Sequence, residues 1–391
     1  MPNALKHKQI TDIRATNFMF LSFLSNGRII QKITGDHMAR PRYAQANETE
    51  RRFAIVDSRG RHVINDDGEK IVGAPLDNRS IVKRKLGNIA YGTQISIGIE
   101  QLLHPQIGAA VEHTKKFWRN PYNRVAVSME PIMSVVYADD PYAAGERVRH
   151  FHERIAGTDY QGRKFNALDP NAFYWAHETF RRGVQNLAEN YSPEQCTDAD
   201  RQQLQYESAT WYSYYGMPMN MVPANYDANL AYRRHMVDNV LEMNPSAERA
   251  INMAIDRRPP RPDIAPKTIW PLARLALLPV TEMMSLMTIG ELPEDIRNKF
   301  GIPFSKSDQE HLDDIRNVVK TFEPPLPSAM QYATVYDAVL RDRGGGYETP
   351  VDYIAHTGLT VGKEVAKRTV VPLFKQTQRA VTAVQSLYRR N

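Results

Sequence analysis

Residues 124–157, "RVAVSMEPIMSVVYADDPYAAGERVRHFHERIAG", contain the pattern that decides the fold. Apolar residues recur three and four positions apart on both sides of the "ADDP" break, as they do on one face of an α-helix. Pro141 at that break is typical of a helix start, where the N–H that proline lacks has no helical partner. The stretch therefore predicts two consecutive helices, and Pro131 is expected to kink or divide the first.

The second of these helices carries two histidines, His150 and His152, two residues apart. Each helical step turns by about 100°, so the two side chains point to nearly opposite sides. Charged residues surround His150, whereas Val148, Ile155 and Ala156 share the face of His152. We therefore expect His150 to be exposed and His152 to face inward. This pattern alone leaves two interpretations of His152 open, a hydrogen-bonded core histidine or a metal or haem ligand.

The helical pattern extends from Ile81 to about residue 345, and strand signals are nearly absent over that range. Before it, β-branched runs are broken by Asp-Ser-Arg-Gly and Asn-Asp-Asp-Gly, which indicate a β-hairpin. We predict an all-α protein with three regions: an N-terminal extension over 1–80 with the hairpin, a single large helical domain over 81–345, and a basic amphipathic helix over 346–391. The later helices are expected at 169–190, 197–215, 223–242, 267–288, 307–321 and 328–343.

Composition excludes several classes of protein. Of 391 residues, 42% are hydrophobic and 24% are charged, which is typical of a globular chain. The net charge is +6, and the lysines and arginines are interspersed with aspartates and glutamates along the sequence. No stripe of basic residues that could bind nucleic acid is therefore expected. The single cysteine, Cys196, excludes an internal disulfide framework. Motifs for P-loops, dinucleotide folds, HExxH zinc proteases and GxSxG hydrolases are missing from the sequence.

No secretory signal or membrane span is expected. The apolar patch at 18–24 is too short to cross a bilayer, and the apolar stretch at 269–293 is interrupted by Arg274, Pro279 and Glu282. We therefore predict a cytoplasmic protein. The basic helix at 346–391 leaves peripheral contact with an acidic membrane or another partner open, and a homo-oligomer is also left open.

Several segments together resemble one large family. They are "IEQLLHPQIGAAVEHTKKFWRNPYNRVAVSMEPIMSVVYADD", "RVRHFHERIAG", "FNALDPNAFYWAHETF" and "YYGMPMNMVPAN". In order they contain His-Pro, His-Thr, Asn-Pro-x-x-Arg, Arg-Val-x-x-x-His, Ala-Leu-Asp-Pro and Trp-x-His-x-Thr. This series resembles the catalytic domain of the rubber oxygenases (latex clearing proteins) and the mycophenolic-acid-pathway oxygenases, over about residues 80–340. The resemblance implies an all-helical fold around a b-type haem.

The resemblance also implies roles for particular residues. The proximal iron ligand of the rubber oxygenases lies in an Arg-x-x-His motif, which here begins at Arg149 and makes His152 the ligand. The distal pair, an arginine and a threonine one turn apart, corresponds to Arg124 and Ser128. A lysine that precedes this threonine in some members is replaced by Val127, which implies a more open distal site.

Three further histidines match family positions or fall in the same window of helices: His104, His113 and His177. With Arg149, they are further candidates for cofactor binding. We expect His104, which precedes a proline, to anchor the junction of two helices. His177 is expected either to line the cavity or to bond a haem propionate, and His113 follows it as an alternative ligand. A run of tyrosines at 212, 214 and 215 packs in the core or walls an apolar pocket.

The expected activity is therefore that of a haem b-dependent oxygenase or oxidase. Its partners would be dioxygen and a hydrophobic small molecule such as a lipid, an isoprenoid or an aromatic natural product. The haem should be non-covalent, because no Cys-x-x-Cys-His motif is present. Two alternatives stay open: a haem enzyme of another reaction type, such as a dehydratase, isomerase or peroxidase, and a haem-free helical protein that binds lipid or a membrane.

Overall fold

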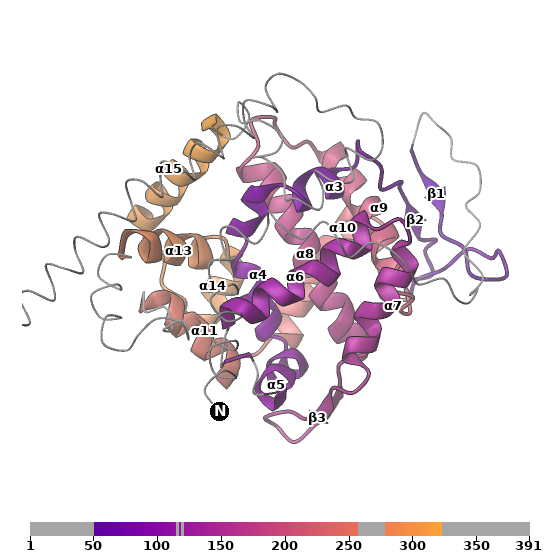
Figure 1. Cartoon of the computed structure of the whole chain (residues 1–391), viewed down its shortest axis with the longest axis horizontal. Coiled ribbons are helices and arrows are strands. Elements are labelled where there is room, and N and C mark those ends of the chain that lie inside the picture. The colour runs from indigo at the N-terminus through magenta and orange to yellow at the C-terminus, as the bar shows by residue number, and fades with distance from the viewer. Residues whose placement is uncertain (1–50, 115–116, 119–120, 257–277, 323–391) are drawn as a thin grey trace, which may run out of the picture.

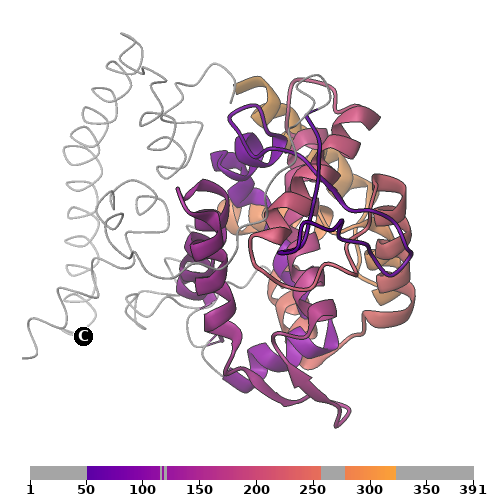
Figure 2. The ribbon, with the colours of Figure 1, turned by 90° about the vertical axis from the view of Figure 1, so that its right-hand side faces the viewer.

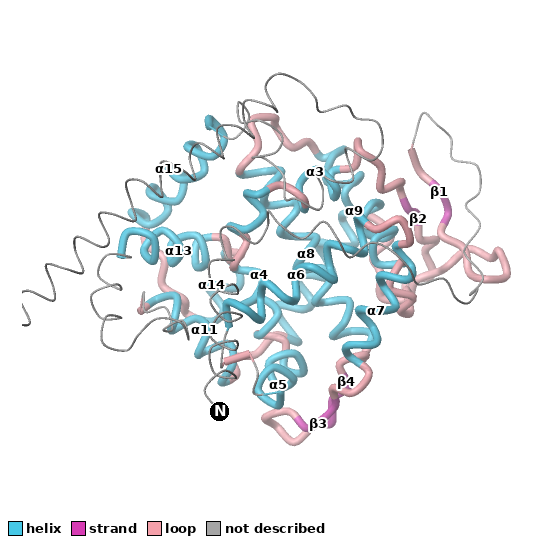
Figure 3. The backbone as a smooth tube through the Cα atoms, in the orientation of Figure 1, coloured by secondary structure: helices cyan, strands magenta, loops and turns pink. Residues whose placement is uncertain are grey.

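The computed structural model describes residues 51–114, 117–118, 121–256 and 278–322, and these residues are mostly helical (Figures 1 and 3). The helices of the first half are α3 (Ile81–Leu86), the 3₁₀ helix η2 (Ile89–Thr93), α4 (Ser96–Leu102), α5 (Pro105–Thr114), α6 (Pro121–Tyr137) and α7 (Pro141–His152). Those of the second half are α8 (Pro170–Asn190), α9 (Asp198–Ser213), α10 (Tyr226–His235), the π-helical turn η3 (Met236–Val240), α11 (Pro245–Ile255), α13 (Leu278–Gly290), α14 (Glu294–Phe300) and α15 (Lys306–Phe322).

The expected N-terminal hairpin is present as a short ribbon at one end of the molecule (Figure 1). Strand β1 (Phe53–Ala54) pairs antiparallel with β2 (Val72–Gly73). Gly60 and Gly68 occupy the two expected turns with φ of 74° and 81°, backbone angles that favour glycine. The ribbon is tied to helix α9, because the Ala74 amide donates a hydrogen bond to Thr210 Oγ1 at 3.0 Å.

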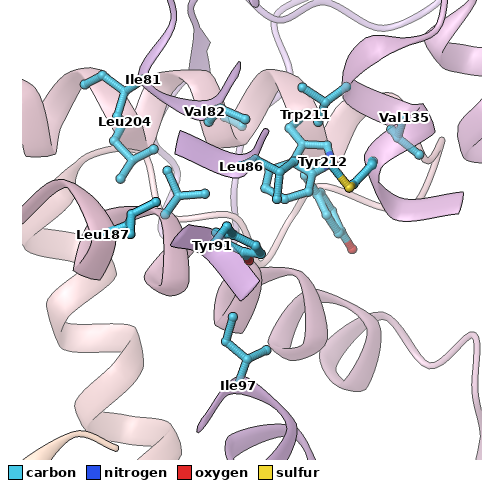
Figure 4. Packing of buried hydrophobic residues seen from close by; sticks show 14 of the residues in the cluster. Ile81, Val82, Leu86, Tyr91, Ile97, Val135, Leu187, Leu204, Trp211 and Tyr212 are labelled. Carbon is cyan, nitrogen blue, oxygen red and sulfur yellow. The ribbon is translucent and has the colours of Figure 1, made fainter. Parts of the chain in front are cut away.

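Helix α8 packs against α3, α4, η2 and α9, which gather around it. Its buried residues recur along most of its 21-residue length, as expected for a helix covered on several sides. The largest apolar cluster joins α3, α6, α8 and α9, and Figure 4 shows part of it, including Val82, Val135, Leu187 and Trp211. A second cluster joins α4, η3, α11 and α14. These two clusters hold the elements that carry the candidate site.

Helices α6 and α7 pack against each other and are joined by residues 138–140. The Asp140 side chain caps α7 by accepting a hydrogen bond from the Ala143 amide at 3.1 Å. Helix α6 runs as one element from Pro121 to Tyr137 with Pro131 inside it. The expectation that Pro131 divides the helix is therefore wrong. Helices tolerate an interior proline where packing outweighs the lost hydrogen bond.

The structure adds elements that the pattern did not predict. Strand β3 (Ala156–Thr158) pairs with β4 (Lys164–Asn166), and this hairpin projects at the foot of the molecule in both views (Figures 1 and 2). Its turn depends on the Asp159 carboxylate, which accepts hydrogen bonds from the amides of Gln161 and Arg163. These three-residue strands are too short to give a clear alternating pattern. Helices α11 and α14 were also not predicted.

Three of the six later helices lie where they were expected, at 170–190, 198–213 and 306–322. The segment expected at 223–242 is divided into α10 and η3, and the segment expected at 267–288 is described only from Leu278. The helices expected at 328–343 and within 346–391 lie outside the described residues. No helix in the described part of the chain is long and apolar enough to cross a membrane.

Candidate functional site

His152 is the last residue of α7, and its side chain is half-buried. Its Nδ1 atom lies 2.7 Å from the carbonyl oxygen of Val148. A carbonyl oxygen can only accept a hydrogen bond, so Nδ1 must donate and therefore carries the proton. In the neutral ring the lone pair is then on Nε2, which is the state that a metal-binding imidazole requires.

The neighbouring histidine has a different environment, as the helical pattern predicts. His150 is exposed, and its Nδ1 lies 3.0 Å from Glu153 Oε2 in a surface pair. The ring of His152 instead meets Phe173 of α8 edge to face, with 5.8 Å between ring centroids and 76° between planes. The predicted orientation of the two side chains is confirmed, whereas the role of His152 as a ligand stays a prediction.

The predicted distal residues both belong to α6, the helix that packs against α7. Arg124 and Ser128 are four residues apart, so they lie one turn apart along this helix. Ser128 is half-buried. The side chain of Arg124 lies outside the described part of the structure, and its distal role stays a prediction.

Aromatic rings extend from His152 into the interior. Phe173 lies 5.4 Å from Tyr215, which follows α9, and Tyr215 lies 5.9 Å from His177. His177 also contacts Trp211 at 4.8 Å. The aromatic cluster comprises Phe173, Tyr174, Trp211, Tyr212, Tyr215 and Tyr232. The cluster thus joins the environments of His152 and His177, two of the histidines that the sequence singled out.

His177 is buried inside this cluster, and its Nε2 lies 2.9 Å from Ser208 Oγ. Burial lowers its pKa to about 3, so the imidazole is neutral at physiological pH. Its Nδ1 atom has no hydrogen-bond partner among the described residues, and the same holds for the hydroxyls of Tyr174 and Tyr232. Such buried polar atoms are rare, and a water molecule or a bound group usually satisfies them.

The other two histidines lie elsewhere. His104 joins α4 to α5, and its carbonyl accepts a hydrogen bond from the Gly108 amide at 2.9 Å. Burial lowers the pKa of His104 to about 4, so it is also neutral at physiological pH. His113 is exposed near the end of α5 and meets Phe165 of β4 edge to face at 6.4 Å. The structure therefore places His104 and His113 at junctions of the scaffold, and the aromatic cluster contains neither.

Arg149 links α7 to the turn that follows α9, and we call this region of contact the seam. Its Nη1 donates to the carbonyl of Gly216 at 3.1 Å. One turn earlier, Gly145 packs directly on the Tyr214 carbonyl, where a β-carbon would clash. The ring of Tyr214 meets Tyr142 at 5.0 Å on this seam, so the predicted tyrosine run is divided between the seam and the aromatic cluster.

A chain of buried charges was missed by the sequence analysis. Glu178 pairs with Arg181 at 2.7 Å and with Arg233 at 3.4 Å, and its side chain is 0% exposed. Arg233 continues to Glu100, which also pairs with Arg182. Burial alone would raise the pKa of Glu178, but the two arginines lower it overall. The only sequence signal was Glu178 three residues before Arg181 on one helix, a spacing that is common on exposed faces.

Within the described residues, no three histidine, cysteine or acidic side chains are grouped as metal ligands. A haem has a different requirement, because the porphyrin supplies four nitrogens and the protein has to supply one axial ligand. A single imidazole with a fixed tautomer meets that requirement.

One family of known proteins matches this chain. The sequence model of one family, described as ER-bound oxygenase mpaB/B'/rubber oxygenase, catalytic domain, matches residues 86–321, more than half of the chain. No curated protein and no solved structure matches the chain. The matched range begins at the end of α3, ends in α15 and contains every predicted site residue. The chain therefore belongs to the family of the mpaB/B' and rubber oxygenase catalytic domain.

Proposed function

We propose that this oxygenase-family protein uses haem b to oxidise a hydrophobic small molecule, such as a lipid or an isoprenoid, with dioxygen. The observation that carries the proposal is the bond from His152 Nδ1 to the Val148 carbonyl, which puts the lone pair of the neutral ring on Nε2. His152 would hold the iron, and the haem would supply the binding and activation of dioxygen.

The surroundings of His152 support a bound group of this kind. Phe173 and Tyr215 offer aromatic surface next to the imidazole. Beyond them, His177 Nδ1 and the Tyr174 hydroxyl are buried polar atoms without partners in the described protein. A molecule with a large apolar body and a few polar groups suits such an environment. His177 is neutral, so it would contribute a hydrogen bond without adding charge.

Arg124 and Ser128 are our candidates for the opposite side of the haem. Both belong to α6, which packs on the helix of His152. A guanidinium stays charged at any physiological pH and stabilises negative charge that develops on an oxygen nearby. The serine hydroxyl would donate a hydrogen bond at the same place. The family resemblance carries this assignment.

The test is the absorption spectrum of the purified protein. We expect a Soret band, and extraction with acidified organic solvent should release the haem, because no covalent attachment motif is present. A protein that stays colourless after haem is added would contradict the proposal and favour the haem-free lipid-binding alternative. Substrate turnover that continues without dioxygen would instead favour a haem enzyme of another reaction type.

A further inference from the structure

Two tyrosine hydroxyls of the aromatic cluster are buried and have no hydrogen-bond partner among the described residues. They belong to Tyr174 of α8, which is only 1% exposed, and to Tyr232 of α10. The two rings meet edge to face, with 5.2 Å between their centroids. A buried hydroxyl that makes no hydrogen bond lowers stability, so native proteins nearly always supply it with a partner.

The Glu178 carboxylate, one turn after Tyr174 on α8, cannot be that partner. An ionised carboxylate offers about four lone-pair positions to hydrogen-bond donors. Each position of Glu178 is already used, because Arg181 donates twice, at 2.7 and 2.8 Å, while Asn229 donates at 3.0 Å and Arg233 at 3.4 Å. The hydroxyls therefore need an acceptor that the described side chains do not provide.

The charges around the two hydroxyls indicate a neutral acceptor. Burial raises the pKa of Tyr174 and of Tyr232 well above the usual value of tyrosine, and Glu178 raises it further at both. Both hydroxyls are therefore protonated and able to donate a hydrogen bond. At each of them the effect of Glu178 exceeds that of the neighbouring arginine, Arg181 or Arg233. The carboxylate would repel an anion at this place but not a neutral oxygen.

We propose that Tyr174 and Tyr232 form a binding site for one neutral oxygen atom, which accepts a hydrogen bond from each hydroxyl. A water molecule supplies this oxygen when no organic ligand is bound, and the oxygen of an alcohol or ketone has the same chemistry. Buried waters typically make about two to four hydrogen bonds, so two donors from the protein are enough to hold one. The site links α8 to α10 and does not depend on the haem.

A crystal structure of the wild-type protein is the direct test. We expect isolated density for one water molecule, about 2.7–2.8 Å from both hydroxyl oxygens. Density that continues into an organic molecule, with an alcohol or ketone oxygen at this place, would support the site and identify a ligand as the source of the oxygen. A carboxylate such as a haem propionate between the hydroxyls, or no density there, would overturn the proposal.

Unfolding in urea provides a second test, in which the two outcomes differ in sign. Tyr174→Phe and Tyr232→Phe each remove one hydroxyl and keep the ring. Loss of a hydroxyl that is bonded to the oxygen should lower the midpoint of unfolding. Loss of an unsatisfied hydroxyl should raise the midpoint, and that result would overturn the proposal. Tyr91→Phe is the matched control, because Tyr91 is also buried and its hydroxyl donates directly to the Phe180 carbonyl at 3.1 Å, so its midpoint should fall.

The double variant of Tyr174 and Tyr232 tests whether the two hydroxyls share one oxygen. Once either hydroxyl is removed, the oxygen is held less firmly, so removal of the other should cost less. The loss of stability in the double variant should therefore be smaller than the sum of the two single losses. Tyr91→Phe combined with Tyr174→Phe should be additive, since these hydroxyls share no partner. Additive losses in both pairs would show that Tyr174 and Tyr232 do not bind the same oxygen and would overturn the proposal.

Discussion

The last turn of α7 and the second half of α8 hold their polar side chains in different ways. His152 is half-buried, and its contacts include the Val148 carbonyl at 2.7 Å and the ring of Phe173. Glu178 is 0% exposed and is bound by Arg181, Arg233 and Asn229. The first arrangement orients a ring, whereas the second neutralises a charge that water cannot reach.

This difference separates a candidate ligand from residues that support the fold. A buried carboxylate that loses its partners is costly, so the partners of Glu178 have to be in place whatever the protein does. A half-buried neutral imidazole leaves no buried charge behind when it is replaced, so we expect its substitution to cost less stability. We therefore expect substitutions in the two regions to affect different measurements.

The largest effect on stability is expected in the buried charges. Glu178→Gln leaves Arg181 and Arg233 without their carboxylate, and the free energy of unfolding should fall by about 3–5 kcal/mol, as for other broken buried pairs. Urea unfolding at pH 7 measures the loss. Glu189→Gln is the control, because its pair with Arg201 is about 25% exposed and should contribute under about 1 kcal/mol. Equal losses would show that the buried chain does not support the fold.

The next prediction is a loss of ligand binding at the haem without a loss of the haem itself. Arg124→Ala should retain its haem, because Arg124 is assigned to the distal side and not to the iron. Its affinity for azide, a small anion that binds ferric haem, should fall by about 10–100-fold, the value of one charge-assisted hydrogen bond. Titration followed at the Soret band measures it, with Arg147→Ala on the exposed face of α7 as the control. Loss of haem in proportion to loss of azide binding would identify Arg124 as a propionate anchor instead.

A smaller effect depends on pH. Burial lowers the pKa values of His177 and His104 to about 3 and about 4. As the pH falls, these histidines are therefore protonated in the unfolded chain before they are protonated in the folded protein. Their contribution to stability is therefore complete above pH 6.5 and is lost as the pH falls through 6.5 toward those values. Each lowers the free energy of unfolding by about 1.4 kcal/mol per pH unit in this window. Urea unfolding between pH 7 and 5 gives the slope of the free energy of unfolding against pH, which counts the protons taken up on unfolding. That count should be lower by about one in His177→Gln than in the wild type. An unchanged slope would mean that His177 is not buried as a neutral ring.

The sequence predicted the helical class and most helices because their apolar spacing persists over several turns. It predicted the orientation of His150 and His152 for the same reason, since the two faces differ in charge. The β3–β4 hairpin was missed because its strands have three residues each and depend on the Asp159 turn. The expected division at Pro131 did not occur, since α6 continues through it.

The candidate site was only partly predictable. Family motifs named His152 and His177, but only the fold shows that Phe173 and Tyr215 join their surroundings. The buried charges were missed because Glu178 and its partner Arg233 are 55 residues apart in sequence. A pattern within one helix cannot show which charges from other helices meet it. His104 joins two helices, as the proline after it indicated. His113, by contrast, was grouped with the site and is found exposed at the end of α5.

The central claim is that His152 holds a haem iron, and the most direct test compares His152→Ala with His150→Ala. The two residues share a helix, so a general folding defect should affect both variants. Haem-to-protein ratio and ferric and ferrous spectra should show lost haem or altered coordination in His152→Ala. They should be unchanged in His150→Ala, whose stability should change by no more than about 0.5 kcal/mol. If His150→Ala empties the site, or if neither variant changes the haem, the claim is contradicted.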